Sequence, residues 1–290
     1  KPAQTALSAP RYVAFEVAAV CAQAYPVGMK LLFLGDVMGK SGRTAVAERL
    51  PALRAAWGLD FVVVNGENAS AGAGLTPEHA KLILNAGADC VTLGDHAFDQ
   101  KDMLSFIETE PRIIRPLNFS KIAPGRGAKV FDATQGRKVL VTQALGQVFM
   151  KRPFDDPFSA VEGILKTHPL GGMVQAVIVD IHAEATSEKI ALGWHLDGRV
   201  TAVLGTHTHV PTADARVLPK GTAFMCDVGM TGPYAGVLGR EVAPVVAKFL
   251  DGMPRRFEVA TDDVRISGAL IEISPAMARA EKIELLTVRR

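Results

Sequence analysis

Five short segments of the chain place a carboxylate, an amide or an imidazole immediately after a run of apolar residues. Carboxylate and amide oxygens suit hard divalent cations, and imidazoles suit Mn, Fe or Zn. No cysteine occurs in these segments, which argues against a structural zinc site. The pattern fits a centre that holds two divalent metal ions, and its candidate ligands are Asp36, Glu67, Asn68, Asp95, His182, His207 and His209.

The spacing of the last two candidates adds a further hint. His207 and His209 are two residues apart, so in an extended segment both imidazoles point to the same side. They could then bind one ion or two adjacent ions. A His-x-His pair is weak evidence by itself, and it gains weight from the other candidates.

The apolar runs that precede the candidate ligands predict buried β-strands. Helices are expected over 43–57 and from Thr76 onward, with Thr76 as the N-cap and Pro77 as the first helical residue. Strands that alternate with helices indicate an α/β fold, and continuous apolar runs indicate strands covered on both faces. Because ligands of α/β sheets bind outside the carboxyl ends of the strands, the candidate residues should meet in one crevice. The predicted strands span 31–34, 61–64, 90–93, 138–142, 176–181, 200–204, 222–226 and 265–273.

The composition excludes several classes of protein. Hydrophobic residues make up 48% of the 290 residues, charged residues make up 21%, and the formal net charge is +2. These values describe an ordinary globular chain without a basic surface for a large nucleic acid. Three cysteines without CxxC spacing form neither a disulfide framework nor a redox pair. A small anionic substrate is compatible with this balance.

Residues 1–28 differ from the rest of the chain because they are rich in alanine and poor in charge. The stretch 17–29 faintly resembles a signal peptide, but Glu16 interrupts the apolar region and the stretch is too short to span a bilayer. We interpret residues 1–28 as a flexible N-terminal extension and 29–290 as a single domain. No other apolar run has membrane-spanning length, so we expect no membrane partner and a cytoplasmic location.

Several other polar residues have structural interpretations that compete with functional ones. Lys40 and Arg43 either flank a phosphate or begin a solvated helix, and Asp180 is either a partner of a ligand or part of a strand. Residues 35–41 resemble a P-loop that is one residue too short, which argues against an NTPase. Surface or packing roles are expected for His79, His168 and His195, while Arg115 and Asn118 are weak candidates for the substrate side.

The order of these motifs resembles the calcineurin-like metallophosphoesterases, and more narrowly their YmdB-type bacterial branch. The resemblance runs from Met29 to about Ser274, and two of its blocks are specific to the branch, HAEATSEK at 182–189 and GMTGP at 229–233. The other matching stretches are GDVMG at 35–39, NGENA at 65–69 and GTHTHVPT at 205–212.

This resemblance implies a metallophosphoesterase αββα sandwich, in which two central mixed sheets are flanked by helices. It implies two divalent ions, Mn or Fe by preference with Zn or Mg as alternatives, and it makes His96 the catalytic histidine. One ion would be held by Asp36, Glu67, Asn68 and His209, and the other by Glu67, Asp95, His182 and His207, so that Glu67 bridges them.

The implied activity is a phosphodiesterase reaction on small cyclic nucleotides of the 2',3'-cyclic AMP type. A hydroxide that bridges the two ions would attack phosphorus, and His96 would protonate the leaving oxygen. Two alternatives use the same centre, a phosphomonoesterase or protein phosphatase and a metal-binding regulatory protein with weak turnover. The same analogy allows a homo-oligomer.

Two positions depart from the general pattern of the superfamily. Met38 replaces the histidine of the first Asp-x-His motif, a loss that is typical of the YmdB branch. Asp95 stands where the family usually has asparagine. An aspartate keeps the oxygen ligand and adds a negative charge, so we expect it to bind the second ion more tightly and to lower the activity.

Overall fold

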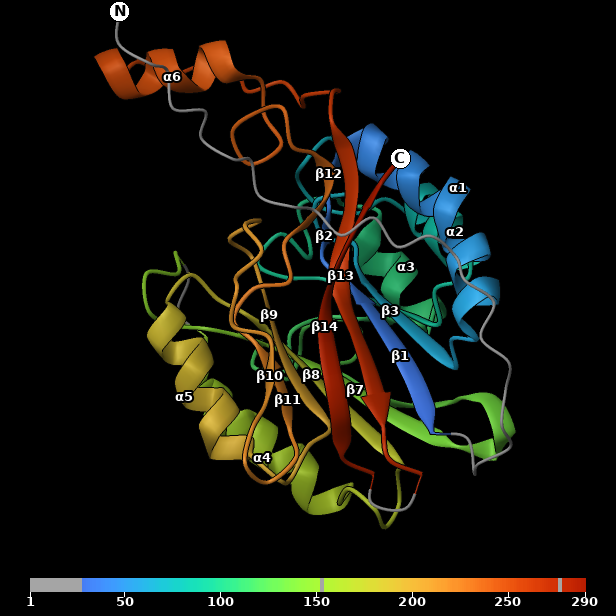
Figure 1. Ribbon diagram of the computed structural model, residues 1–290. Helices are drawn as coiled ribbons and strands as arrows, with labels where there is room; N and C mark the ends of the chain where they lie inside the picture. Colours follow the sequence, from blue (N-terminus) through green and yellow to red (C-terminus); the bar gives the residue numbers. More distant parts are fainter. Residues whose placement is uncertain (1–27, 152–153, 276–277) are drawn as a thin grey trace, which may run out of the picture.

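A computed structural model of the chain describes residues 28–151, 154–275 and 278–290. The predicted N-terminal extension, 1–28, therefore lies outside the described residues except for Gly28. The described chain forms two mixed β-sheets that pack face to face, with helices on their outer faces (Figure 1).

The first sheet has a parallel half that contains the first three predicted strands. β1, β3, β4 and β5 run parallel, and β13 lies antiparallel to β1 on its other side. The strand order is β2-β12-β13-β1-β3-β4-β5, with β14 also paired to β13. The strands are β1 (Met29–Leu34), β2 (Asp36–Val37), β3 (Phe61–Asn65), β4 (Cys90–Thr92), β5 (Ile113–Ile114), β12 (Met230–Pro233), β13 (Val264–Ile273) and β14 (Ala280–Arg289).

The second sheet has a parallel centre with an antiparallel strand at each edge. Its order is β10-β11-β9-β8-β7-β6, and β7, β8, β9 and β11 are parallel to one another. The strands are β6 (Ala128–Asp132), β7 (Lys138–Leu145), β8 (Ala176–His182), β9 (Ala202–Thr206), β10 (Arg216–Val217) and β11 (Ala223–Met225).

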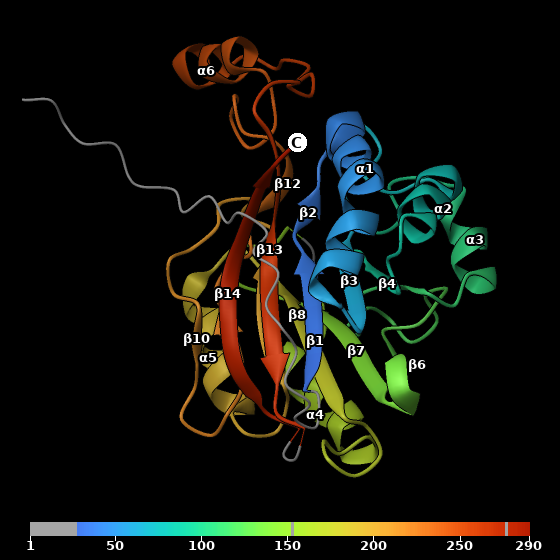
Figure 2. The ribbon, with the colours of Figure 1, turned by 45° about the vertical axis from the view of Figure 1, so that its right-hand side comes forward.

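The helices complete the outer layers of the sandwich. In Figure 2, α1, α2 and α3 lie beside the first sheet, α4 and α5 belong to the second, and α6 stands outside the layers. A short 3-10 turn, Thr134–Gly136, links β6 to β7. The helices are α1 (Gly39–Trp57), α2 (Pro77–Asn85), α3 (Met103–Thr109), α4 (Pro157–Thr167), α5 (Thr186–Leu196) and α6 (Val242–Asp251).

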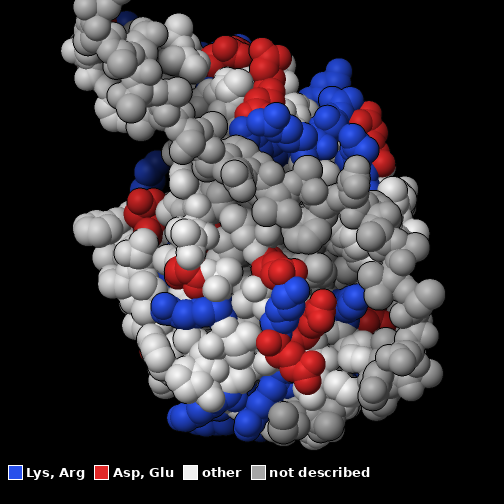
Figure 3. All heavy atoms as spheres, viewed as in Figure 1, with Lys and Arg blue, Asp and Glu red and all other residues white. Residues whose placement is uncertain are grey.

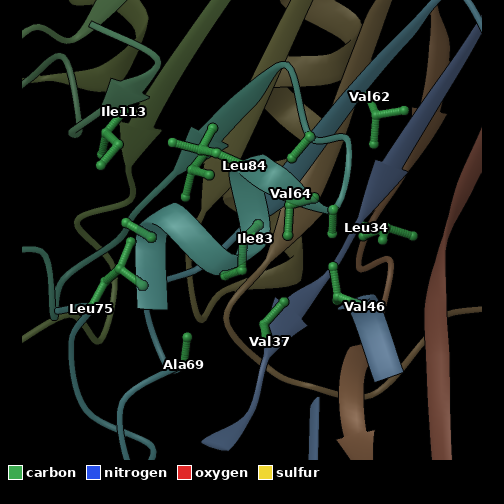
Figure 4. Packing of buried hydrophobic residues seen from close by; sticks show 14 of the residues in the cluster. Leu34, Val37, Val46, Val62, Val64, Ala69, Leu75, Ile83, Leu84 and Ile113 are labelled. Carbon is green, nitrogen blue, oxygen red and sulfur yellow. The ribbon is translucent and has the colours of Figure 1, made fainter. Parts of the chain in front are cut away.

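Three buried apolar clusters fill the spaces between these layers. Successive residues of a strand face opposite sides, so Leu31 and Phe33 of β1 lie in the cluster between the sheets. Leu32 and Leu34 face the other way, into the cluster beneath α1 and α2 (Figure 4). A third cluster joins α4 and α5 to the outer face of the second sheet. The predicted αββα sandwich, with strands covered on both faces, is confirmed.

Most of the predicted elements are confirmed, but one helix begins earlier than predicted and several elements, β6 and β14 among them, were not predicted. The first helix begins at Gly39 rather than at residue 43, because Met38 already accepts a hydrogen bond from the main-chain nitrogen of Gly42. The strand Ala280–Arg289 was missed because half-exposed and charged residues interrupt its apolar positions. The helix that begins after Thr76 is confirmed, since the Thr76 side chain accepts a hydrogen bond from the main-chain nitrogen of His79.

The surface agrees with the near-balance of charge in the sequence. On the described part of the face shown in Figure 3, basic and acidic side chains occur in mixed groups. Across the described residues, no helix combines the length and apolar character needed to cross a membrane.

Candidate metal centre

The carboxyl ends of strands from both sheets bring the candidate ligands to one place. β3 and β4 end just before Glu67 and Asp95, whereas β8 and β9 end at His182 and just before His207. Each of these pairs of neighbouring strands is parallel, so both members end at the same edge of their sheet. The predicted convergence at the strand ends is therefore observed.

One half of the cluster is formed by Glu67, Asp95, His182 and His207. One potential ligand atom from each of these side chains lies within 4.8 Å of the others. His182 Nε2 is 3.1 Å from both Glu67 Oε1 and Asp95 Oδ1, and His207 Nδ1 is 3.5 Å from Asp95 Oδ1. The distances suit a shared cation as well as the ion pairs that the side chains form with one another.

The other half of the cluster is formed by Asp36, Asn68 and His209. Asn68 Nδ2 is 3.1 Å from His209 Nε2 and donates to Glu67 Oε1 at 2.9 Å. His209 Nε2 is 3.9 Å from Asp36 Oδ1. Glu67 thus contacts residues of both halves, and the structure brings together all seven residues that the sequence nominated.

Asp36 provides the observation that tests whether these residues fit a cation. Its side chain is fully buried, and its Oδ1 has no hydrogen-bond partner among the described residues. A buried carboxylate oxygen without a partner is costly. Burial is also the main reason why the pKa of Asp36 is raised. Because a divalent cation would satisfy this oxygen, the donor set fits metal ions.

The carboxylates of Glu67 and Asp95 are held in their charged form by the imidazoles. Burial alone would raise both pKa values, but the charge of His182 and its hydrogen bonds lower them. Burial likewise opposes protonation of His182, yet Glu67 and Asp95 raise its pKa well above the usual value.

The histidine segment after β9 differs from the extended one predicted. β9 ends at Thr206, and the backbone φ angles of His207 and His209 are +96° and +65°. Residues other than glycine seldom adopt positive φ, and when they do they are commonly found at functional sites. The two imidazoles consequently reach different halves of the cluster instead of lying side by side. His209 is held by Leu238, whose main-chain oxygen accepts from its Nδ1 at 3.2 Å.

Asp180 lies behind the cluster and orients His182. The sequence left open whether Asp180 is a partner of a ligand or part of a strand, and its contacts make it a partner of this candidate ligand. The hydroxyl of Thr206 donates to Asp180 Oδ1 at 2.7 Å, so it accepts a hydrogen bond from His182 Nδ1 at 2.8 Å. When His182 is neutral, its Nε2 lone pair faces Glu67 and Asp95, as a metal ligand requires. Burial raises the pKa of Asp180 to about 6.

His96 stands beside the cluster with a partner that the sequence did not reveal. Its Nδ1 is 2.6 Å from Asp99 Oδ2, which leaves Nε2 on the far side of the ring, and its side chain is 38% exposed. Burial lowers the pKa of His96, but the carboxylates of Glu67, Asp95 and Asp99 raise it overall. The i, i+3 spacing of His96 and Asp99 was the available signal for this pair.

The residues with weaker sequence arguments lie outside the described cluster or have structural contacts. His195 pairs with Glu162 on the surface, and His79 contacts the hydroxyl of Ser70. Arg115 and Asn118 direct their polar groups to main-chain atoms, which favours structural roles over lining the substrate side. His168 caps the end of α4, Lys40 is exposed, and Arg43 donates to the main-chain oxygen of Ala69.

The fold and this cluster of carboxylates and imidazoles at its strand ends define a metallophosphoesterase. More narrowly, the chain belongs to the family described as YmdB-like protein, whose model matches residues 32–286. A 2',3'-cyclic-nucleotide 2'-phosphodiesterase of Bacillus subtilis (strain 168) is 42% identical over 260 residues, which are 90% of this chain and 97% of that protein.

Solved structures of two further proteins share the fold. A protein from Thermus thermophilus is 42% identical, with a TM-score of 0.83, and the match covers 90% of this chain and 99% of that one. A phosphatase from Mycoplasma pneumoniae is 34% identical, with a TM-score of 0.84, over 90% of this chain and 94% of that one. The resemblance drawn from the motifs is confirmed.

The close approach at Gly94 generates a prediction for stability. A Cβ atom at this position would lie 1.9 Å from Glu67 Oε2 and 2.7 Å from His182 Cε1. We expect Gly94→Ala to lower the free energy of unfolding by about 1–3 kcal/mol through overpacking. Urea denaturation in the presence of EDTA measures this loss without a contribution from bound metal.

Gly163 in α4 provides the matched control, because a Cβ atom there would meet nothing within 4 Å. Gly163→Ala should stabilise the protein by about 0.5–1 kcal/mol, since alanine is the better helix former. A Gly94→Ala variant as stable as the wild type would contradict the packing described for the cluster.

Proposed function

We propose that the chain is a dinuclear-metal phosphodiesterase that hydrolyses small cyclic nucleotides of the 2',3'-cyclic AMP type. The observation that carries this proposal is the meeting of seven oxygen and nitrogen donors around the buried Glu67 carboxylate. The activity named for the Bacillus subtilis relative supports the choice of substrate. In this proposal residues 29–290 act as one domain, because both sheets contribute ligands.

At the coarser level, the chain is a hydrolase of phosphoric esters, as its relatives are named. One ion would be held by the half that contains Asp36, Asn68 and His209, the other by the half that contains Asp95, His182 and His207, and Glu67 would contact both. When bound, such ions neutralise charge on phosphoryl oxygens and lower the pKa of a water molecule. We propose Mn or Fe as the ions, because the set mixes carboxylates with imidazoles.

The pair His96 and Asp99 supplies the proton that the reaction needs. Opening a cyclic phosphodiester leaves one phosphate ester and frees a ribose oxygen, which departs more readily when it is protonated. Asp99 binds Nδ1 of His96 at 2.6 Å and thereby orients Nε2 for donation. The raised pKa of His96 favours the protonated form that a general acid requires.

The substrate class is tested by comparing a cyclic diester with a simple monoester. Protein stripped of metal by EDTA and reloaded with Mn²⁺ should hydrolyse 2',3'-cyclic AMP in preference to p-nitrophenyl phosphate, and EDTA should abolish the activity. Preference for the monoester would favour the phosphatase alternative. Bound Mn²⁺ without turnover of either substrate would favour the regulatory alternative.

His96→Ala should separate proton donation from metal binding. We expect turnover of 2',3'-cyclic AMP to fall by about 10²–10⁴-fold, the usual contribution of a general acid, while Mn²⁺ affinity stays at the wild-type value. The loss should be much smaller for bis-p-nitrophenyl phosphate, whose leaving group needs no proton. His79→Ala is the control, because that imidazole contacts Ser70 outside the described cluster. Equal losses on both substrates would contradict the proposed role.

Asp95→Asn tests the position at which this chain departs from the usual family pattern. Asp95 Oδ1 lies 3.1 Å from His182 Nε2, so its charge acts directly on that half of the centre. Removing the charge should weaken binding of the second Mn²⁺ and should raise turnover at saturating metal, because the ion becomes more electrophilic. Calorimetric titration and initial rates measure the two effects. An unchanged affinity together with an unchanged rate would refute the interpretation.

A further inference from the structure

The backbone at His207 and His209 is strained by positive φ angles, so surrounding contacts must hold it in this conformation. Thr208, the residue between them, makes two of these contacts. Thr208 donates twice to the same atom, Asp227 Oδ2, from its main-chain nitrogen at 3.1 Å and from its hydroxyl at 2.8 Å. A segment with positive φ at two positions relaxes unless its surroundings determine its conformation. The double hydrogen bond ties the middle of the segment to a fixed point.

Asp227 can anchor this segment because its side chain and its main chain are both held by hydrogen bonds. It follows β11, it is buried, and its Oδ1 accepts a hydrogen bond from the main-chain nitrogen of Gly229 at 2.9 Å. Its main chain exchanges two hydrogen bonds with Thr212, between Asp227 N and Thr212 Oγ1 at 2.9 Å and between Thr212 N and Asp227 O at 3.0 Å. The carboxylate therefore has little freedom to follow the histidine segment if that segment moves.

Lys189 balances the charge of this carboxylate. It lies on α5 with no exposed surface, and its Nζ donates to Asp227 Oδ2 at 2.9 Å. A buried carboxylate without a partner would be strongly destabilising, and Lys189 provides that partner as an ion pair. A charged acceptor forms stronger hydrogen bonds than a neutral one, and Thr208 benefits from this on both of its donors.

We propose that Thr208, Asp227 and Lys189 are positioning residues that hold His207 and His209 in the geometry needed for metal binding. None of the three belongs to the ligand set, and they act through the backbone of the two histidines. The inference rests on the proposed function, since it assumes that both histidines are ligands. This positioning role explains how two imidazoles that are only two residues apart reach different halves of the centre.

Thr208→Val and Thr208→Ser provide the test. Valine keeps the shape and the main-chain donor but removes the hydroxyl, whereas serine keeps both donors. Loss of an outer partner of a metal ligand usually costs about 10–100-fold in metal affinity, and we expect that loss in the valine variant. The serine variant should bind Mn²⁺ with nearly wild-type affinity. Calorimetric titration of metal-free protein with Mn²⁺ gives the affinities.

Thr222→Val is the matched control for a loss of stability alone. Thr222 is a buried threonine before β11, and its hydroxyl donates to Val200 O at 2.7 Å and accepts from Gly198 N at 2.8 Å. The control should lower the thermal midpoint while leaving Mn²⁺ affinity unchanged. If Thr208→Val behaves like this control, the positioning role is overturned and the proposed function stands.

Hydrogen exchange of the metal-free protein makes the test independent of activity and of metal binding. The peptide that contains residues 206–210 should exchange faster in Thr208→Val than in the wild type or in Thr208→Ser. Unchanged exchange would overturn the inference directly. If exchange is faster in Thr208→Val but the wild-type protein binds no Mn²⁺, both the metal-positioning role and the proposed function are overturned.

Discussion

The hydrogen bonds that Asp180 accepts from both sheets fix the carboxylates of the first sheet relative to the imidazoles of the second. Thr92 of the first sheet donates to Asp180 Oδ2 at 2.7 Å, and Gln143 of the second donates to the same oxygen at 2.6 Å. Most of the side chains between the two sheets are apolar, and their attraction has little directionality. The hydrogen bonds to Asp180 are directional and lie close to the strand ends. They therefore determine how the carboxylates of the first sheet face the imidazoles of the second.

The site then concentrates charge where the solvent cannot screen it. Glu67 and His182 are both buried, and each shifts the pKa of the other toward the charged form, against the effect of burial. The polar groups behind them are arranged in layers, with Thr206 orienting His182 and Asp99 orienting His96. Ligands with fixed orientation and tautomer need little reorganisation when an ion binds, and this is the usual value of a second layer of hydrogen bonds.

The sequence predicted that the candidate ligands would meet, because apolar runs mark buried strands and these residues follow directly at the strand ends. It could not predict the path of the backbone through His207 and His209, since spacing alone gives no φ angle. Asp99 and Asp227 were also missed as partners of site residues. For Asp99 the only signal was its i, i+3 spacing from His96, whereas the partners of Asp227 are distant in the chain and are specified by three-dimensional packing. The strand β14 was missed because its charged residues hide its pairing with β13.

The place of β1 in the first sheet determines when the site can form during synthesis. β1 lies between β3 and β13, and β13 is made long after both of the others. Proteins emerge from the ribosome with the N-terminal part first, so Asp36, Glu67 and Asp95 appear before any of the candidate histidine ligands. His182 lies at the end of β8 and His207 follows β9, so the carboxylates meet these imidazoles only when both sheets have formed. An ion held by residues of both sheets would stabilise the finished fold as a whole.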